Sequence, residues 1–424
     1  MIVYNFVLAF FILCSLPKGL YQKWRYGKYS HSLPYKMGSS FPQISKNGRK
    51  VIWFHACSLG ETKAIVALAK KAKNELTNPL LIVSSTTETG HAEAKKNISF
   101  ADYHVYLPFD FSWVIGPIVK RVAPDYVVLC ESEFWLNFLQ ASKKAGAKIA
   151  LVNGKLSERS LKRFKWFPSF SNDLFSTFDH FCVQNRLYAN RFSEMGVPEN
   201  KITITGNLKF DEDYAITPPK ELQDWKQQMG ISENDPVLVV GSSHDPEEKV
   251  VLDALGPVWG RFPKLKVVIV PRHPERFSEV SQILSQRDIP FIPYSKISER
   301  TGHEKVILID AMGILRKCYQ IATLAIVGGS YTPKIGGHNI IEPCGYGVPV
   351  LFGPFMHTQP ELVQLVKEYK AGLQVTSEDL SQTILELLSD PHKRLELGKE
   401  GKVLVDAMKG ATERTWNTLG LDRG

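Results

Sequence analysis

Residues 50–87 read KVIWFHACSLGETKAIVALAKKAKNELTNPLLIVSSTT, and their pattern is the strongest indication of the fold. Two short apolar runs, residues 50–56 and 80–87, have the length and composition of buried strands. Between them, Ile65, Leu68 and Ala72 recur at the spacing that places them on one face of a helix. A strand, a helix and a second strand in this order predict two parallel strands joined by a crossover helix.

The same alternation continues along the chain, and it predicts parallel sheets covered by helices on both faces. A length of 424 residues favours two domains. We therefore predict an α/β protein with two doubly wound Rossmann-like domains facing a cleft, and a proline-rich, charged linker over residues 214–236. The predicted parts are a membrane anchor with its basic flank (1–30), a first domain (31–215), a second domain (216–395), and a single C-terminal helix that packs back on the first domain (396–424).

Positive charge is concentrated at the N-terminus. Residues 1–60 contain eight Lys or Arg residues and no Asp or Glu, out of a net charge of +9. A nucleic-acid-binding protein would carry this charge on its folded domain, so we expect no nucleic-acid partner. Residues 2–16 are almost all apolar and basic residues follow, which is typical of an anchor held on the cytoplasmic side of a membrane. The alternatives are a spanning segment, a monotopic one, or a buried core helix.

The six cysteines are scattered without C-x-x-C spacing, which indicates a reducing compartment and neither a zinc site nor a disulfide framework.

Glu61 is the first acidic residue of the chain. Ser58 and Glu61 have the spacing of a capping box at a helix start, so one interpretation is structural. The position also follows a strand, and Gly60 beside it allows a ligand to approach closely. Spacing alone therefore leaves a helix cap and a catalytic group both open. A helix N-terminus is expected to lower the pKa of such a carboxylate.

Other charged residues also follow predicted strands. Glu131 and Glu133 come after DYVVL, and Lys209 comes after KITIT. Ligands bind at the carboxyl ends of strands in such sheets, so these residues are candidates for a site, with a surface loop as the alternative. Asp211 and Asp213 form a D-x-D pair, but so short a motif occurs by chance, and we predict no metal.

The second half contains strand ends suited to an anion. Residues 241–244 precede a helix start whose free N–H groups favour negative charge, and Arg272 follows another strand. Residues 328–354 contain seven glycines, whose N–H groups can cradle a phosphate. Asn339 is a predicted N-cap there, and Glu342 is placed to bind ribose hydroxyls. A purely structural glycine-rich loop is the alternative.

Several ordered motifs show a family resemblance: WFHACSLGE, SSTTETG, ESEFWLN, NGKLSERS, GNLKFD, VPRHPERF, DAMG and GGHNIIEP followed by GVPVLFGP. Over nearly its whole length the chain resembles the 3-deoxy-D-manno-octulosonic acid (Kdo) transferases of lipopolysaccharide synthesis. The resemblance implies a B-type glycosyltransferase fold. It also implies inverting transfer, without metal or cofactor, of Kdo from CMP-Kdo to a lipid A precursor (lipid IVA). The expected place is the cytoplasmic face of a bacterial inner membrane that carries anionic lipids.

The resemblance also assigns roles to residues. It makes Glu61 the general base, and Glu131 and Lys209 the groups that stabilise the transition state. It assigns CMP-Kdo binding to Pro271, Arg272, His273, Met312, Gly313, Ile314, Asn339, Ile340, Ile341 and Glu342. One departure lies close to these roles, because Gly154 and Lys155 stand where the family usually has Ala and Arg. Two other hypotheses remain: a B-type glycosyltransferase that uses a different nucleotide-sugar on a lipid acceptor, and an inactive nucleotide-sugar-binding protein.

Overall fold

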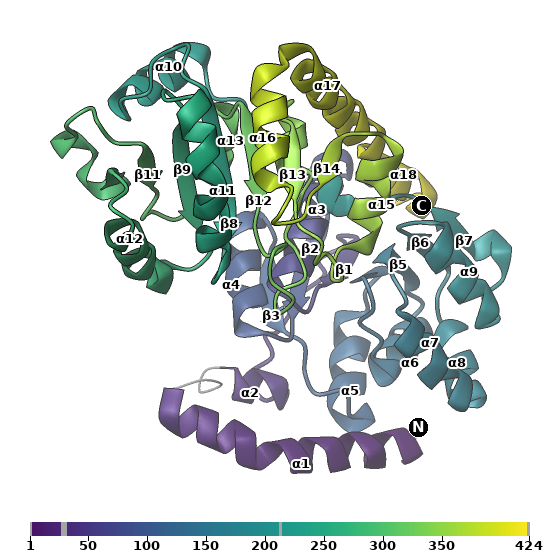
Figure 1. The fold of residues 1–424 in the computed structure, drawn as a ribbon. Helices are drawn as coiled ribbons and strands as arrows, with labels where there is room; N and C mark the ends of the chain where they lie inside the picture. The colour runs from purple at the N-terminus through teal and green to yellow at the C-terminus, as the bar shows by residue number, and fades with distance from the viewer. Residues whose placement is uncertain (1, 27–31, 212–213, 422–424) are drawn as a thin grey trace. The chain divides into compact units, whose positions relative to one another are not determined.

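The computed structural model describes residues 2–26, 32–211 and 214–421. The chain divides into two compact units, the first made of Met1–Glu212 with Met408–Gly424 and the second of Asp213–Ala407. Each unit is built on its own parallel sheet flanked by helices (Figure 1). The predicted pair of parallel α/β sheets is therefore confirmed.

The first unit alternates strands and helices along the chain. Its helices are α1 (Ile2–Tyr26), α2 (Leu33–Lys36), α3 (Leu59–Glu75), α4 (Glu88–Asn97), α5 (Ser112–Val122), α6 (Leu136–Lys144), α7 (Glu158–Trp166), α8 (Pro168–Phe175), α9 (Arg186–Glu194) and α18 (Ala411–Leu419). Its strands are β1 (Val51–His55), β2 (Leu80–Ser85), β3 (Tyr103–Tyr106), β4 (Tyr126–Cys130), β5 (Lys148–Gly154), β6 (His180–Val183) and β7 (Ile202–Ile204).

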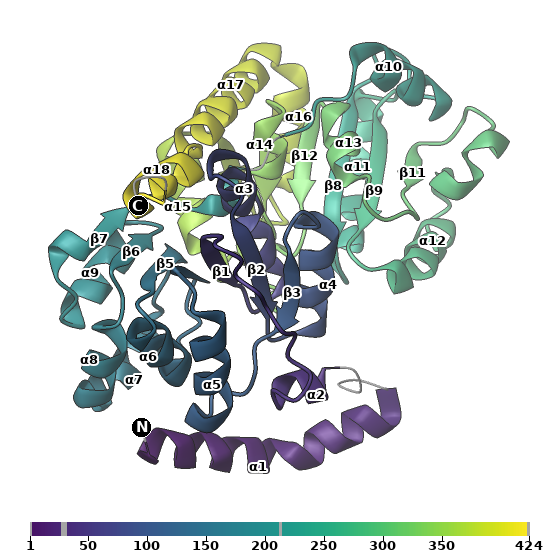
Figure 2. The same ribbon diagram turned by 180° about the vertical axis from the view of Figure 1, so that it is seen from behind.

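The strands of this sheet lie in the order β3-β2-β1-β4-β5-β6-β7, all parallel (Figure 2). Strand β1 pairs with both β2 and β4, so the direction of winding reverses between β1 and β4. In such sheets the crevice at this reversal is the usual ligand site.

Strand β1 shows why the sheet is covered on both faces. Val51 and Trp53 pack in one buried cluster, while Ile52 and Phe54 pack in another. Successive side chains of a strand point to opposite faces, so an uninterrupted apolar run needs cover on both sides. Helix α3 supplies part of that cover through Ile65 and neighbouring residues.

Helix α1 is attached to the first unit by polar contacts near its start. The Tyr4 hydroxyl donates to Asp110 Oδ2 at 2.8 Å, and Asn5 Nδ2 donates to Ser112 Oγ at 2.9 Å. Asn137 Nδ2 in turn donates to Asn5 Oδ1 at 2.8 Å. Within the described residues, no helix combines the length and the apolar character needed to cross a membrane.

The second unit repeats the architecture. Its helices are α10 (Pro219–Gln228), α11 (Glu247–Arg261), α12 (Phe277–Gln286), α13 (Leu315–Gln320), α14 (Glu342–Gly345), α15 (Pro360–Glu368), α16 (Leu380–Ser389) and α17 (Pro391–Met408). Its strands are β8 (Val237–Ser243), β9 (Lys266–Pro271), β10 (Phe291–Pro293), β11 (Val306–Leu308), β12 (Leu324–Val327), β13 (Val350–Phe352) and β14 (Gly372–Gln374). The order β10-β11-β9-β8-β12-β13-β14 reverses between β8 and β12.

Helix α10 lies inside the segment predicted as a linker. Pro219 occupies its first turn, a position where proline is well tolerated, so the prolines begin a helix rather than prevent one. Trp225 is buried and its Nε1 donates to the Tyr294 hydroxyl at 3.0 Å. The helix is therefore a packed part of the second unit.

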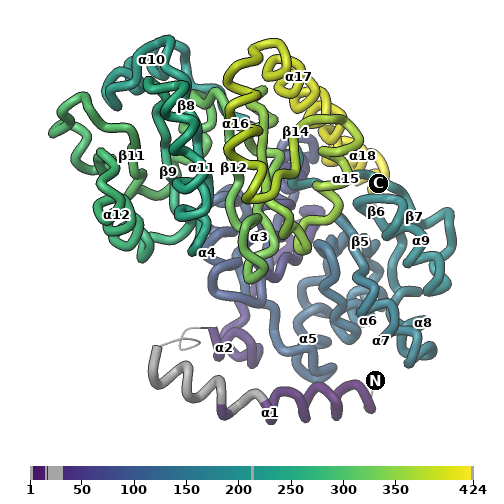
Figure 3. Tube along the Cα trace, viewed as in Figure 1, coloured from purple at the N-terminus to yellow at the C-terminus, as the bar shows by residue number. Residues whose placement is uncertain are grey.

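The C-terminal residues form two helices, where one was predicted. Gly410 has φ of 85°, a left-handed conformation that ends α17 before α18 begins (Figure 3). The Asp211 carboxylate accepts hydrogen bonds from the backbone N–H groups of Gly410, Ala411 and Thr412. Asp211 of the D-x-D pair is thus engaged at the start of α18, while Asp213 lies outside the described residues.

Candidate active site

Charged side chains gather at the winding reversal of the first sheet. Glu61 lies in the first turn of α3, which follows β1, and Glu131 directly follows β4. Strands β1 and β4 are neighbours, and β5, which leads to Lys155, lies beside β4. The edge where ligands bind in this fold therefore carries two carboxylates and a lysine from three adjacent strands.

Glu61 is both a helix cap and a buried acid. Its Oε1 accepts a hydrogen bond from Ser58 Oγ at 2.9 Å, and its Oε2 accepts one from Cys57 N at 2.8 Å. Burial raises its pKa above the ordinary glutamate value, although the hydrogen bonds from Cys57 and Ser58 oppose that rise. The predicted lowering of this pKa is wrong, because the loss of water outweighs the hydrogen bonds from Cys57 and Ser58.

Glu131 is held by two lysines. Its Oε1 lies 2.5 Å from Lys209 Nζ, its Oε2 pairs with Lys155 Nζ, and Asn153 Nδ2 donates to Oε1 at 3.3 Å. Burial acts to raise the pKa of Glu131, but the two lysine charges and their hydrogen bonds lower it below its usual value. This carboxylate therefore stays ionised. Its backbone φ of 64° is unusual for a residue with a side chain.

Lys209 is positioned by the loop that follows β7. Its backbone N donates to Asn207 Oδ1 at 3.1 Å, and Leu208 N donates to Asn153 Oδ1 at 2.9 Å. Asn153 thus fixes this loop and also contacts Glu131. A side chain at Gly60 would begin 3.8 Å from Lys209 Nζ, so the ammonium group lies beside the helix turn that presents Glu61.

Glu133 is the second acid of the E-x-E motif. Burial, followed by the negative charge of Glu61, raises the pKa of Glu133 to about 7. Burial and the charge of Glu133 in turn raise the pKa of the Cys57 thiol to about 12, so this cysteine is not a nucleophile at neutral pH. The edge therefore holds one locked carboxylate, Glu131, and two whose protonation changes closer to neutral pH.

In the second unit, a protein carboxylate occupies the proposed anion cradle. Glu247, in the first turn of α11, accepts hydrogen bonds from the N–H groups of His244, Gly329 and Tyr331 at 3.0, 2.6 and 2.7 Å. Those N–H groups are not available to a phosphate. Glycine 353 is required by packing, because a Cβ there would lie 2.2 Å from Ser330 O. For much of residues 328–354, the alternative interpretation of a structural glycine-rich loop therefore explains the glycines.

A cluster of histidines lies beside Arg272 at the winding reversal of the second sheet. His244 follows β8 and His338 follows β12, with their Nε2 atoms 2.7 Å apart. The His273 ring lies 5.3 Å from that of His244. Burial, followed by the charges of His273 and Arg272, lowers the pKa of His244. Burial, then His244 and Arg272, lowers that of His338 to about 4. Both histidines are therefore neutral near pH 7, and the positive charge that favours an anion here comes from Arg272.

The other residues predicted to bind CMP-Kdo are placed differently from one another. Pro271 ends β9 and is buried, and the exposed Met312 and Gly313 come just before Ile314, the N-cap of α13. Helix α14 begins at Glu342 with Ile341 in the cap position, so Asn339 is not the N-cap and instead accepts from Ile341 N at 3.1 Å. The side chains of Ile340 and Ile341 are buried, which leaves only their backbone for a ligand.

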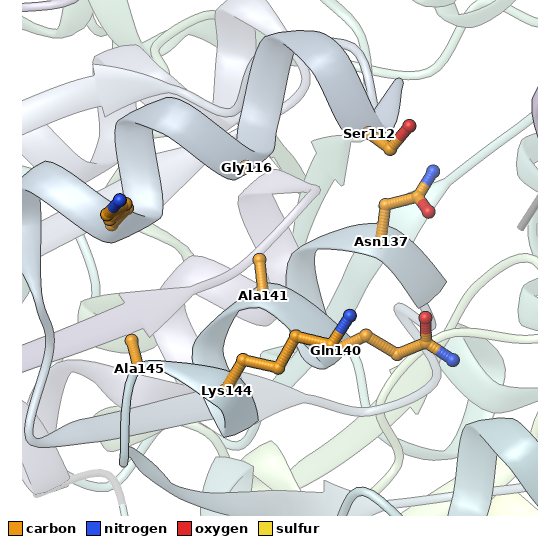
Figure 4. Close-up of a pocket in the computed structure, with 8 residues that line it drawn as sticks. Ser112, Gly116, Asn137, Gln140, Ala141, Lys144 and Ala145 are labelled. Atoms are coloured by element: carbon orange, nitrogen blue, oxygen red, sulfur yellow. The ribbon is translucent and has the colours of Figure 1, made fainter.

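A groove of about 320 Å³ lies elsewhere in the first unit, between α5 and α6 (Figure 4). Its lining includes the small residues Gly116 and Ala141 and the lysines Lys120 and Lys144. None of the predicted site residues lines it.

The comparisons with known proteins identify the family. A family model described as 3-Deoxy-D-manno-octulosonic-acid transferase (kdotransferase) matches residues 27–212. The 3-deoxy-D-manno-octulosonic acid transferase of Chlamydia muridarum is 34% identical over 419 residues, which cover 98% of this chain and 96% of that one. The chain belongs to the Kdo transferase family. The Kdo transferase of Haemophilus influenzae is 29% identical and covers 87% of this chain and 86% of its own length.

Solved structures agree on the fold of this Kdo transferase. A glycosyltransferase from Rickettsia africae covers 88% of this chain and 99% of its own, with TM-score 0.60 and 16% identity. The UDP-GlcNAc 2-epimerase of Neisseria meningitidis covers 87% and 99%, with TM-score 0.61 and 14% identity. At these identities the likeness concerns the fold alone, and it places the Kdo transferase among B-type glycosyltransferase folds.

Three residues near these clusters were not assigned a role from the sequence. Lys155 and Asn153 belong to the NGKLS motif, which was noted only for its departure from the family pattern, yet both contact Glu131. His338 stands in GGHN, where the neighbouring glycines favoured a backbone site for an anion and no role was assigned to the histidine side chain. Position at the end of a buried strand, the signal that selected Glu131, applies equally to Asn153 and Lys155 at the end of β5.

Proposed function

We propose that this Kdo transferase moves Kdo from CMP-Kdo to a lipid A precursor, lipid IVA, in lipopolysaccharide synthesis. The observation that carries the proposal is the group formed by Glu61 and the Lys155–Glu131–Lys209 ion pairs, at the strand edge of the first sheet. Transfer requires a base for the acceptor hydroxyl and positive charge near the departing anion, and this group supplies both.

In the proposed reaction, Glu61 removes the proton of an acceptor hydroxyl while that oxygen attacks the anomeric carbon of Kdo. The bond between that carbon and the phosphate oxygen breaks on the opposite side, CMP departs with the bonding electron pair, and the configuration inverts. Ser58 and Cys57 fix the carboxylate of Glu61, so its approach is set before substrate binds. Lys155 and Lys209 keep Glu131 ionised.

The donor is assigned to the second unit. Arg272 supplies positive charge for the single phosphate of CMP and the carboxylate of Kdo, and His273, with His244 and His338, supplies imidazole nitrogens beside it. The other donor contacts proposed are Pro271, Met312, Gly313, Ile314, Asn339, Ile340, Ile341 and Glu342. One phosphate carries less charge than a diphosphate, so this cluster would serve without a metal ion.

The place of the reaction is proposed to be the cytoplasmic face of the inner membrane, with α1 as a monotopic anchor on anionic lipid. Tyr4 and Asn5 bond to the first unit, whereas Phe6, Phe10 and Phe11 are exposed, with fractions of 72, 63 and 64%. A helix that is hydrogen-bonded to the protein on one side and exposes apolar side chains on the other is suited to the interface of a bilayer.

The donor assignment is tested by transfer in vitro. Membranes containing the protein are incubated with tetraacylated lipid A precursor and, separately, radiolabelled CMP-Kdo, UDP-sugars or GDP-sugars. The proposal expects a labelled lipid only with CMP-Kdo, with its mass raised by one or more Kdo residues. Transfer from UDP- or GDP-sugars but not from CMP-Kdo would overturn it. CMP binding without transfer from any donor would favour an inactive binding protein.

A further inference from the structure

A basic and aromatic corner projects from the first unit where α7 meets α8. It consists of Lys162, Arg163, Lys165, Trp166 and Phe167, which we call the α7 corner. The side chains of Trp166 and Phe167 are 75 and 64% exposed. Single exposed apolar residues are common, but two adjacent exposed aromatic residues preceded by three cations are typical of a surface that binds a partner.

The core of the unit does not need these two aromatic rings. Helix α7 buries Leu161 instead, and the half-buried Phe164 packs edge-on to Phe134 and Phe175 with ring centroids 5.9 and 5.1 Å apart. The helix therefore has an inner apolar face of its own, separate from Trp166 and Phe167. Their exposure is not a by-product of core packing.

The α7 corner lies next to the start of α1. Phe170 of α8 stacks on Tyr4 of α1 with ring centroids 5.9 Å apart, and on Phe164 of α7 at 6.4 Å. Figures 1 and 2 both show α7 and α8 close to the N-terminal half of α1. Trp113 of α5, 63% exposed, follows Ser112, which bonds to Asn5 of α1. Exposed aromatic side chains thus flank the apolar surface of α1 on two elements.

The cations of the corner are only partly paired with neighbouring acids. Lys162 and Lys165 pair with Glu158 and Glu194 at 2.8 and 2.7 Å, but all four side chains are about half or more exposed, and such pairs exchange partners easily. Among the described residues, Arg163 has no ion pair. Cations beside tryptophan are the combination that favours the headgroup layer of an anionic bilayer.

We propose that the α7 corner is a second membrane contact, which inserts Trp166 and Phe167 among the headgroups of anionic phospholipid beside α1. This inference rests on the proposed membrane location of the enzyme. One apolar helix on a bilayer leaves the unit free to rotate about the helix axis. A second contact removes that freedom and holds the first unit in one orientation on the lipid surface.

The test uses the full-length protein and sedimentation with vesicles of phosphatidylcholine, alone or with one part in three of phosphatidylglycerol. The variant W166S/F167S should bind both kinds of vesicle about tenfold less tightly. The variant R163Q/K165Q should lose binding only to the anionic vesicles, by about fivefold for each cation. L395S removes a side chain that is 74% exposed on α17 of the second unit, and it should bind like the wild type.

A second readout reports insertion itself. Brominated phospholipid quenches tryptophan that enters the bilayer, so W166F should remove part of the quenching seen in the wild type. Unchanged vesicle binding in W166S/F167S, or unchanged quenching in W166F, would overturn the proposal. So would loss of a co-purifying protein from W166S/F167S while vesicle binding persists, because the corner would then be a protein interface.

The same variant separates this inference from the proposed function. With CMP-Kdo and acceptor dispersed in detergent, W166S/F167S should transfer Kdo at the wild-type rate, since its site is intact and no bilayer is needed. If the wild type transfers no Kdo under these conditions, the proposed function fails while the vesicle results still decide the membrane contact. If the wild type binds no vesicles, the membrane contact fails whatever the transfer assay shows.

Discussion

At the scale of single residues, the strand edge of the first unit combines two kinds of carboxylate. Glu131 is buried and kept ionised by Lys155 and Lys209, whereas burial raises the pKa of Glu61 and Glu133. Carboxylates whose environments push their pKa values apart are the arrangement expected for acid–base chemistry. The base assigned to Glu61 should therefore lose activity as pH falls through a pKa above the ordinary glutamate value.

The raised pKa of Glu133 makes stability depend on pH. The folded protein holds this proton up to a pKa of about 7, while the unfolded chain releases it near the ordinary glutamate pKa of 4.5. Stability from this group is complete below the lower value and declines as pH rises through the folded pKa. E133Q should flatten that decline in the melting temperature measured across this range. E368Q changes an exposed glutamate of α15 and should leave the decline unchanged. A decline as steep in E133Q as in the wild type would contradict the raised pKa of Glu133.

The ion pairs of the buried Glu131 should contribute more to the free energy of unfolding than ion pairs on the surface. K209M leaves a buried carboxylate with one lysine and should lower the free energy of unfolding by about 1–3 kcal/mol. K165M removes an exposed pair with Glu194 and should cost no more than about 1 kcal/mol. Urea unfolding of both variants provides the comparison, and equal losses would show that Glu131 does not depend on Lys209.

At the scale of secondary structure, the sequence predicted the elements better than their ends and contacts. The apolar runs identified the strands because a fully covered strand needs apolar residues on both faces, as β1 shows with Trp53 and Phe54. The break at Gly410 was missed because a glycine within a helical pattern does not reveal its φ. The cradle over residues 328–331 was misjudged because only the fold brings Glu247 to those N–H groups.

Two helical glycines of the second unit should respond oppositely to alanine. A Cβ at Gly398 of α17 would lie 2.2 Å from Gly347 O, so G398A should destabilise the unit by about 1–3 kcal/mol. Gly260 of α11 has no atom within 4 Å of that position apart from its chain neighbours and its own helix backbone, and G260A should stabilise the unit by about 0.5–1 kcal/mol. Thermal unfolding measures both, and a stabilising G398A would show that α17 does not approach Gly347 so closely.

The start of α18 offers a third comparison. D211A leaves the N–H groups of Gly410, Ala411 and Thr412 without their acceptor and should cost about 1–2 kcal/mol. D211N retains an acceptor oxygen and should recover much of this loss, which chemical unfolding would measure. If D211A is as stable as wild type, the cap does not hold α18 in place.

At the scale of the whole molecule, the chain consists of two units, each with a winding reversal where chemistry-bearing side chains meet. Glu61 and Glu131 belong to the first unit, and Arg272 and the three histidines belong to the second. The proposed division of labour places acceptor activation in one unit and nucleotide binding in the other. Variants in one unit should therefore leave the function of the other largely intact.

Nucleotide binding gives a prediction at this scale. CMP at about 100 times its dissociation constant should stabilise the protein by about 2.7 kcal/mol. R272Q should lose most of this thermal shift, because it removes a cation from the cluster around His244 and His338. R287Q, which removes an arginine paired on the surface with Asp253, should keep it. An undiminished shift in R272Q would move the nucleotide away from this cluster.

The role of Glu61 as general base is tested by the rate of Kdo transfer by E61Q, measured together with the affinity of this variant for CMP. We predict a fall in the rate of about 10²–10⁴-fold, the usual contribution of a general base, with CMP affinity unchanged because the residues proposed to bind the nucleotide lie in the second unit. A rate close to that of the wild type would contradict it, and would reduce Glu61 to the cap that Ser58 and Cys57 make of it.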